Sequence, residues 1–160
     1  MAKSTFTSFH FDRDYWRVQQ VRNMGAIEGN QIISPQSWEE VKRKGKAAIE
    51  NWIDGEMKGK SAVVVLVGKD TASREWVNYE IRKAWDEKRP LVGIRINGLK
   101  NKDGYTDTPG SNPFANITAG GALLSKYVTL HTPSGTDSKA VYQSINDNLA
   151  TWVAGAYKRP

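Results

Sequence analysis

The sequence predicts a three-layer α/β sandwich built around a mainly parallel sheet of five strands. Three observations lead to this prediction: short apolar runs of strand length, helical patterns between them, and connections long enough to cross from one strand to the next. A parallel crossover needs about a dozen residues or more and is normally helical. Helices should therefore cover both faces of the sheet, in a flavodoxin-like arrangement.

Five segments have the composition of strands, and Val, Ile and Phe are prominent among them. In chain order they are TFTSFHF (5–11), QII (31–33), AVVVLVG (62–68), LVGIRI (91–96) and YVTLH (127–131). Four further segments repeat apolar residues at helical intervals. They are DYWRVQQVRNMG (14–25), KGKAAIENWIDGEMKG (44–59), TASREWVNYEIRKAW (71–85) and SKAVYQSINDNLATWVAGAY (138–157). Thr71 or Ser73 can cap the start of the third helix.

Three connections should gather at the carboxyl ends of the strands, where sheets of this kind bind ligands. They are HFDRD (10–14), SPQSWEEVKRKG (34–45) and GKDTAS (68–73). The connection 97–126 is too long and too rich in Gly, Pro and Asn for an ordinary loop. It is either a functional loop or a poorly ordered insertion.

Composition narrows the class of protein. A chain of 160 residues with 39% hydrophobic content fits one globular domain, 1–160. The absence of cysteine excludes disulfides and thiolate chemistry, and with two histidines we expect no metal site. No run approaches the roughly 18 apolar residues of a membrane span, and the first residues lack the apolar stretch of a signal peptide. We therefore expect a soluble, cytoplasmic protein with no membrane partner.

The formal charge of +6 is compatible with an anionic partner. The basic residues are nevertheless spread along the predicted helices, without the dense tract that favours nucleic acid. A solvated surface is the first interpretation and a phosphate-bearing ligand the second. We expect no nucleic-acid partner.

One carboxylate stands out because helical spacing places it in an apolar stripe. Along 71–85, Glu80 shares a face with Trp76, Val77 and Ile81. An unpaired carboxylate in such a setting is costly, so it needs a partner, a wet cleft or a raised pKa. In the structural alternative, Glu80 pairs with Arg13 or with a lysine of 34–45. In the functional alternative, it belongs to a site.

Five segments of the chain form a recognisable set: TSFHFDRDYWRVQQVRN, SWEEVKRKGKAAIENWID, SAVVVLVGKDTASREWVNYEIRKAW, PLVGIRINGL and PGSNPF. Together they resemble the ThsB-type family of TIR-like domains from Thoeris anti-phage defence. The resemblance covers roughly residues 5–153. Its most specific element is an aromatic-x-x-x-Glu pattern, Trp76 to Glu80, that follows VVVLVG and precedes LVGIRI.

The resemblance implies a TIR-like, flavodoxin-like fold and cleavage of NAD+ at its nicotinamide–ribose bond. NAD+ is then a substrate, and no cofactor is implied. ThsB-type members make a cyclic ADP-ribose isomer that activates a separate effector, so this effector is an expected partner. Glu80 would be the catalytic glutamate, with Trp76 among the substrate-binding residues.

Five more residues are candidates for substrate binding. Phe9 and His10 can stack on or hydrogen-bond the substrate, although Phe9 suits the core and His10 a structural position. Arg13 can bind the pyrophosphate through two oxygens at once. Ser73 contacts the ribose or caps its helix. Trp38 covers the nucleotide or packs on the next helix.

Two other functions compete with this interpretation. Asp12, Asp14 and Asp70 suggest a phosphoacceptor receiver domain. Receiver domains also require a lysine at the end of the last strand, where this chain has His131 and Thr132. The stronger alternative is a non-catalytic TIR-like interaction module, since a fold does not fix a function. Self-association into a homo-oligomer is compatible with either TIR-like function.

Overall fold

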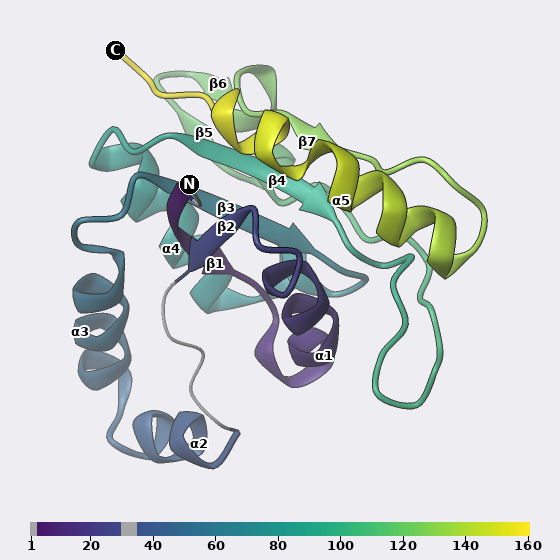
Figure 1. The fold of residues 1–160 in the computed structure, drawn as a ribbon. Helices are drawn as coiled ribbons and strands as arrows, with labels where there is room; N and C mark the ends of the chain where they lie inside the picture. Colours follow the sequence, from purple (N-terminus) through teal and green to yellow (C-terminus); the bar gives the residue numbers. More distant parts are fainter. Residues whose placement is uncertain (1–2, 30–34) are drawn as a thin grey trace.

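The computed structural model describes residues 3–29 and 35–160, and a five-stranded sheet forms its centre (Figure 1). The strands are β1 (Lys3–Ser8), β2 (Ile27–Gly29), β3 (Ala62–Val67), β4 (Leu91–Arg95) and β7 (Leu130–His131). They lie in the order β2-β1-β3-β4-β7, and each adjacent pair is parallel. The predicted flavodoxin-like α/β architecture is therefore confirmed.

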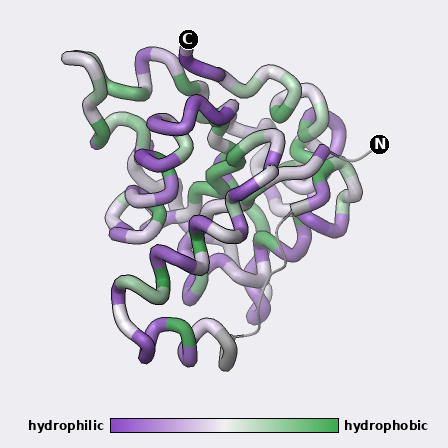
Figure 2. The backbone as a smooth tube through the Cα atoms, turned by 90° about the vertical axis from the view of Figure 1, so that its left-hand side faces the viewer, coloured by the Kyte–Doolittle hydropathy of each residue, from purple (hydrophilic) through white to green (hydrophobic). Residues whose placement is uncertain are grey.

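Helices cover both faces of this sheet (Figure 1). They are α1 (Phe11–Arg22), α2 (Pro35–Arg43), α3 (Lys46–Met57), α4 (Glu75–Asp86) and α5 (Ser138–Ala154). One core cluster joins α1 and α5 to the sheet, and a second joins α3 and α4 to its other face. In Figure 2 the hydrophobic stretches gather toward the middle of the molecule. Among the described residues, no helix combines the length and apolar character needed to cross a membrane.

The first two strands differ from their predicted positions. β1 ends at Ser8, because α1 already begins at Phe11, so the predicted strand 5–11 and helix 14–25 both start too late. The predicted strand 31–33 lies outside the described residues, and the second strand of the sheet is Ile27–Gly29. Three residues at a sheet edge carry too little periodicity to be recognised in a sequence.

Segment 34–45 was predicted to be a loop, but it contains the helix α2. Trp38 and Val41 of this helix pack against the core beside α3 and α4. Lys42 forms an ion pair of 2.7 Å with Glu39, one turn earlier. The prediction was wrong because the helix, which begins at Pro35, is too short to give a clear pattern, whereas tertiary packing of its apolar side stabilises it.

The second half of the connection 97–126 belongs to the core. It forms the 3-10 turns η2 (Pro113–Asn116) and η3 (Leu124–Lys126) and the hairpin of β5 (Thr118–Ala119) with β6 (Ala122–Leu123). Phe114, Ile117 and Leu124 are buried against the α4 face of the sheet. A Cβ at Gly93 would lie 2.7 Å from the Phe114 ring, so glycine in β4 provides the space for this ring. Part of the connection is therefore structural.

Candidate active site

Glu80 lies on the buried side of α4, as its helical spacing predicts. The helix begins at Glu75, and its side toward the sheet consists of Val77, Glu80, Ile81 and Ala84. Glu80 is 7% exposed, whereas its apolar neighbours on this side are at most 1% exposed. The carboxylate is thus held in the core, close to the carboxyl end of β1.

The partner of Glu80 is a hydroxyl group. Ser8 Oγ, at the last residue of β1, donates a hydrogen bond of 2.6 Å to Glu80 Oε1. Arg13 binds Asp107 and Asp70 instead, and Lys42 binds Glu39. In the part of the chain that the structure describes, Glu80 has no basic partner, so the predicted pairing with Arg13 or with a lysine of 34–45 is wrong.

Burial dominates the electrostatics of this carboxyl group. Desolvation raises the pKa of Glu80 to about 8, and the hydrogen bond from Ser8 acts in the opposite direction. At neutral pH the unliganded site therefore holds mostly the protonated acid. A carboxyl group of this kind can become an anion when a positive charge arrives beside it.

A pocket of about 210 Å³ lies at the amino end of α4. Four of the predicted substrate-binding residues line it: Phe9, His10, Trp38 and Trp76. Lys42 and Arg74 add positive charge to its wall. Glu80 does not line the pocket but lies one helical turn beyond Trp76, and its partner Ser8 directly precedes Phe9. The carboxylate is therefore outside the pocket, on a residue one helical turn from Trp76 in its lining.

Trp38 packs on the next helix, which confirms one of its two predicted roles, and covering the nucleotide stays a prediction. Its ring lies 5.7 Å from that of Trp52 on α3 and 5.8 Å from that of Phe11, and it also lines the pocket. Phe9 likewise packs against the core while lining the pocket. These aromatic rings link α2 and α3 to the connection after β1.

His10 is half-buried in the same pocket, and no hydrogen bond to its Nδ1 is found among the described residues. Burial lowers its pKa, and the nearby charge of Arg74 adds to this effect. The imidazole is therefore neutral at neutral pH. A neutral ring can offer both a donor and an acceptor nitrogen to a ligand.

Ser73 and Arg13 do not line this pocket. Ser73 is exposed in the 3-10 turn η1 (Thr71–Ser73), where its Oγ donates to the carbonyl of Asp70 at 2.9 Å. The N-cap of α4 is Arg74, without a side-chain capping bond, so the predicted capping by Thr71 or Ser73 is wrong. The hydroxyl of Thr71 instead accepts from the backbone N–H of Gly68 at 2.8 Å.

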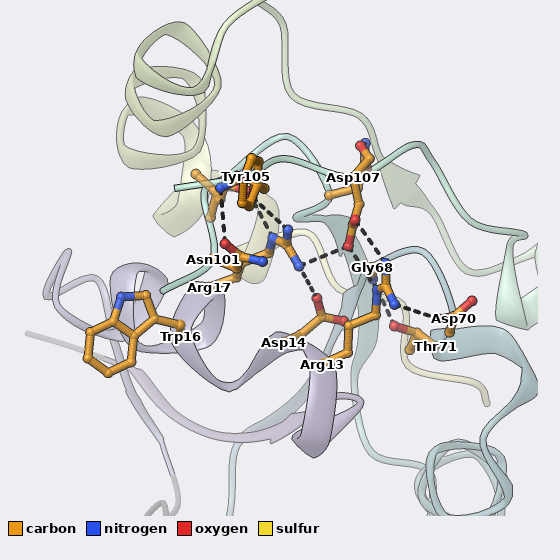
Figure 3. Close-up of polar contacts among 12 residues, drawn as sticks. Arg13, Asp14, Trp16, Arg17, Gly68, Asp70, Thr71, Asn101, Tyr105 and Asp107 are labelled. Carbon is orange, nitrogen blue, oxygen red and sulfur yellow. Dashed lines mark hydrogen bonds and ion pairs between the residues drawn. The ribbon is translucent and has the colours of Figure 1, made fainter. Parts of the chain in front are cut away.

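Arg13 joins two loops of the chain (Figure 3). Its Nε and Nη2 each donate to the Asp107 carboxylate at 2.9 Å, and its Nη1 lies 3.3 Å from Asp70. The guanidinium lines a neighbouring cavity of about 440 Å³ together with Trp16 and Lys102. Its donors are thus engaged with carboxylates in this structure.

A buried charge network around Arg17 of α1, on the face of the sheet opposite α4, was not predicted from the sequence (Figure 3). Arg17, fully buried, donates to Asp14 at 2.9 Å and to the carbonyls of Leu99 and Tyr105, and lies 3.0 Å from Asp107. One sequence pattern indicates this network. Asp14 and Arg17 are one turn apart on the side of α1 that also carries the buried residues Val18 and Val21.

The same network argues against a receiver domain. Asp14 is engaged with Arg17, Asp70 with Arg13, and Asp12 is exposed, so the three acids do not form a shared carboxylate cluster. Within residues 3–29 and 35–160, no group of three His, Cys, Asp or Glu side chains is placed to hold a metal ion.

Comparison with known proteins agrees with the resemblance seen in the sequence. A family model described as the TIR-like domain of the Thoeris protein ThsB matches residues 6–101, a range that begins within β1 and includes β2 to β4 and Glu80. The chain is also 37% identical over 119 residues to "Putative cyclic ADP-D-ribose synthase ThsB1" of Bacillus cereus (strain MSX-D12). That alignment covers 71% of this chain and 62% of the relative, so the chain spans less than two thirds of the relative's length.

Proposed function

The chain belongs to the ThsB family of TIR-like domains from Thoeris systems, and on this premise we propose that it is an NAD-cleaving enzyme with Glu80 as its catalytic carboxylate. It releases nicotinamide and forms a cyclic ADP-ribose-type signal that activates a separate effector in anti-phage defence. One observation carries the proposal: a buried carboxylate, which accepts a hydrogen bond from a hydroxyl group, lies on the same helix as Trp76 of an aromatic-lined pocket and one turn from it.

The chemistry needs only one carboxylate. Nicotinamide leaves as a neutral base from a cationic pyridinium, since the electron pair of the broken C–N bond returns to the ring nitrogen. No group has to protonate it, in contrast to ordinary glycosides, where a second carboxyl group protonates the leaving oxygen. A single anion beside the ribose stabilises the positive charge that develops on the sugar. Water or an atom of the adenosine half then forms the new bond to the sugar carbon.

The raised pKa of Glu80 fits this substrate. With a pKa of about 8 the free site keeps its proton at neutral pH. The pyridinium carries a positive charge, which favours the ionised form of a carboxyl group next to it. Substrate binding would thus release the proton and create the anion where the ribose lies.

The size of the pocket supports binding of one end of the substrate there. About 210 Å³ suits a single planar ring, because pockets for whole drug-sized ligands measure about 300–1,000 Å³. Phe9, Trp38 and Trp76 supply faces on which such a ring can stack. Since Glu80 does not line this pocket, binding has to move part of the pocket wall for the carboxylate to meet the ribose.

The test is nicotinamide release from NAD+, followed by chromatography and mass spectrometry at increasing protein concentration. Wild type is compared with Glu80→Gln and with Asp86→Asn, which changes an exposed carboxylate of the same helix. We expect release that disappears in Glu80→Gln and persists in Asp86→Asn, and the product mass separates cyclic from linear ADP-ribose. Equal release by wild type and Glu80→Gln would overturn the proposal.

A non-catalytic interaction module is the second candidate function. Trp16 and Tyr105 are 53% and 69% exposed, and exposed aromatic residues of this kind favour protein interfaces. If assembly alone matters, Glu80→Gln changes neither self-association nor the biological output. Absence of nicotinamide release at every concentration would favour this function.

A further inference from the structure

We infer that Ser8 is a positioning residue for Glu80: its hydroxyl group holds Oε1, so that Oε2 is the carboxylate oxygen presented to the substrate. This inference rests on the proposed function, because it concerns the same carboxylate. Ser8 is not among the candidate site residues that the sequence predicts.

The contact has the geometry of a strong hydrogen bond. Ser8 Oγ and Glu80 Oε1 are 2.6 Å apart, within the range of about 2.5–2.7 Å that a hydroxyl donor makes with a carboxylate. Ser8 is fully buried, so water does not compete for its hydroxyl group. Among the described residues, no other side chain or backbone group forms a hydrogen bond with the Glu80 carboxyl group.

Ser8 is itself held firmly in place. It is the last residue of β1 and pairs in register with Val65 of β3, in the middle of the sheet. Strand alternation puts its side chain on the same face as Phe6, which packs in the core cluster that also contains Val77 and Ile81 of α4. The sheet therefore fixes the donor, and the donor fixes one oxygen of a side chain that would otherwise rotate.

A purely structural role explains this pair poorly. An apolar pair of similar shape at these two positions would avoid the cost of burying a hydroxyl and a carboxyl group. The pair also lies next to the pocket, since Ser8 precedes Phe9 and Glu80 is one turn from Trp76. The position, the hydroxyl donor and the lack of a basic partner among the described residues together favour a role in orienting the carboxylate.

The first experiment measures the pH dependence of NAD+ cleavage for wild type, Ser8→Ala and Ser8→Thr. Removal of a donor to the ionised carboxylate should move the acid limb of the profile upward by about one pH unit. It should lower kcat about tenfold at neutral pH, with a smaller change in KM. Ser8→Thr keeps the hydroxyl group and should restore the wild-type profile. Ser4→Ala, in the same strand and on the same face, is the matched control.

The second experiment needs no substrate and separates this inference from the proposed function. The carboxyl carbon of Glu80, labelled with 13C, is titrated by NMR in free wild type, Ser8→Ala and Ser4→Ala, with Glu80→Gln to assign the signal. We expect the midpoint to rise in Ser8→Ala and to stay unchanged in Ser4→Ala.

The outcomes are distinguishable. If Glu80-dependent cleavage is found but Ser8→Ala leaves both the pH profile and the titration midpoint of Glu80 unchanged, the positioning role is refuted and the proposed function stands. If the midpoint moves while no variant cleaves NAD+, the hydrogen bond is supported and the role in this reaction falls with the proposed function. A loss of activity in Ser8→Ala that is uniform over pH would point to unfolding and contradict the inference.

Discussion

Two buried carboxylates lie on opposite faces of the sheet, and their surroundings differ. Asp14 on α1 is fully buried and faces the guanidinium of Arg17, which also binds two backbone carbonyls. Glu80 on α4 is 7% exposed and has the hydroxyl of Ser8 as its partner. Burial raises the pKa of both groups, and a positive charge opposes this effect at Asp14 but not at Glu80. The partner of a buried acid, rather than its burial, separates a structural group from a candidate catalytic one.

The largest expected effect tests the catalytic side of this comparison. Glu80→Gln should reduce nicotinamide release by about a hundredfold to a thousandfold, as for the loss of a group that stabilises developing charge. The substitution preserves shape and keeps an acceptor for Ser8, so the circular dichroism spectrum and the melting temperature should not fall. A variant that retains more than about a tenth of the activity would show that Glu80 is not the catalytic carboxylate.

The second largest expected effect concerns the structural pair of this comparison, Asp14 and Arg17. Arg17→Met leaves the buried Asp14 without its counter-charge and should lower the free energy of unfolding by about 3–5 kcal/mol. Urea denaturation measures this change. Arg13→Met is the matched control, because that guanidinium is partly exposed and its ion pairs should contribute about 1 kcal/mol or less. Equal losses in the two variants would contradict the structural role assigned to Arg17.

The pH dependence of stability should distinguish wild type from Glu80→Gln. The pKa of Glu80 is about 8 in the folded chain against an ordinary value of 4.5. Between these values the folded state holds a proton that the unfolded state has released, so the free energy of unfolding falls as pH rises and levels off above pH 8.

Wild type should therefore lose about 2–4 kcal/mol across this pH range relative to Glu80→Gln, which has no proton to exchange. Urea denaturation of both proteins at several pH values gives the difference directly, since other titrating groups contribute equally to the two. Parallel stability curves would mean that Glu80 is ionised in the folded chain at neutral pH.

The smallest expected effect concerns the connection between α1 and the segment 97–107. Arg13 lowers the pKa of Asp107 through hydrogen bonds, and Arg17 adds its charge. Asp107→Asn should lower the free energy of unfolding at neutral pH by about 1–2 kcal/mol. This difference should shrink as the pH falls and wild-type Asp107 becomes protonated. NAD+ cleavage should change by less than about threefold, and a much larger loss would make this network part of the active site.

The sequence was most informative where a pattern is long. Six consecutive buried residues of β3 and the apolar side of α4 identified the sheet, the helix and the unusual position of Glu80. It was least informative for short elements such as β2, whose three residues gain their structure from pairing with β1. The hydrogen-bond partner of the Glu80 carboxylate could not be predicted either, because Ser8 lies 72 positions away in the chain. Contacts of this range depend on how the strands are ordered, which local periodicity does not specify.

The separation between Ser8 and Glu80 also has a consequence for how the protein matures. β1 pairs with β3, more than 50 positions later, and α4 follows β3. Closing such a long loop costs entropy before any contact compensates for it, so non-local pairing of this kind is slow to form. The carboxylate meets its hydroxyl donor only after α4 has emerged from the ribosome and docked on the sheet. A partly synthesised chain that ends before α4 would therefore lack the contact between Ser8 and Glu80.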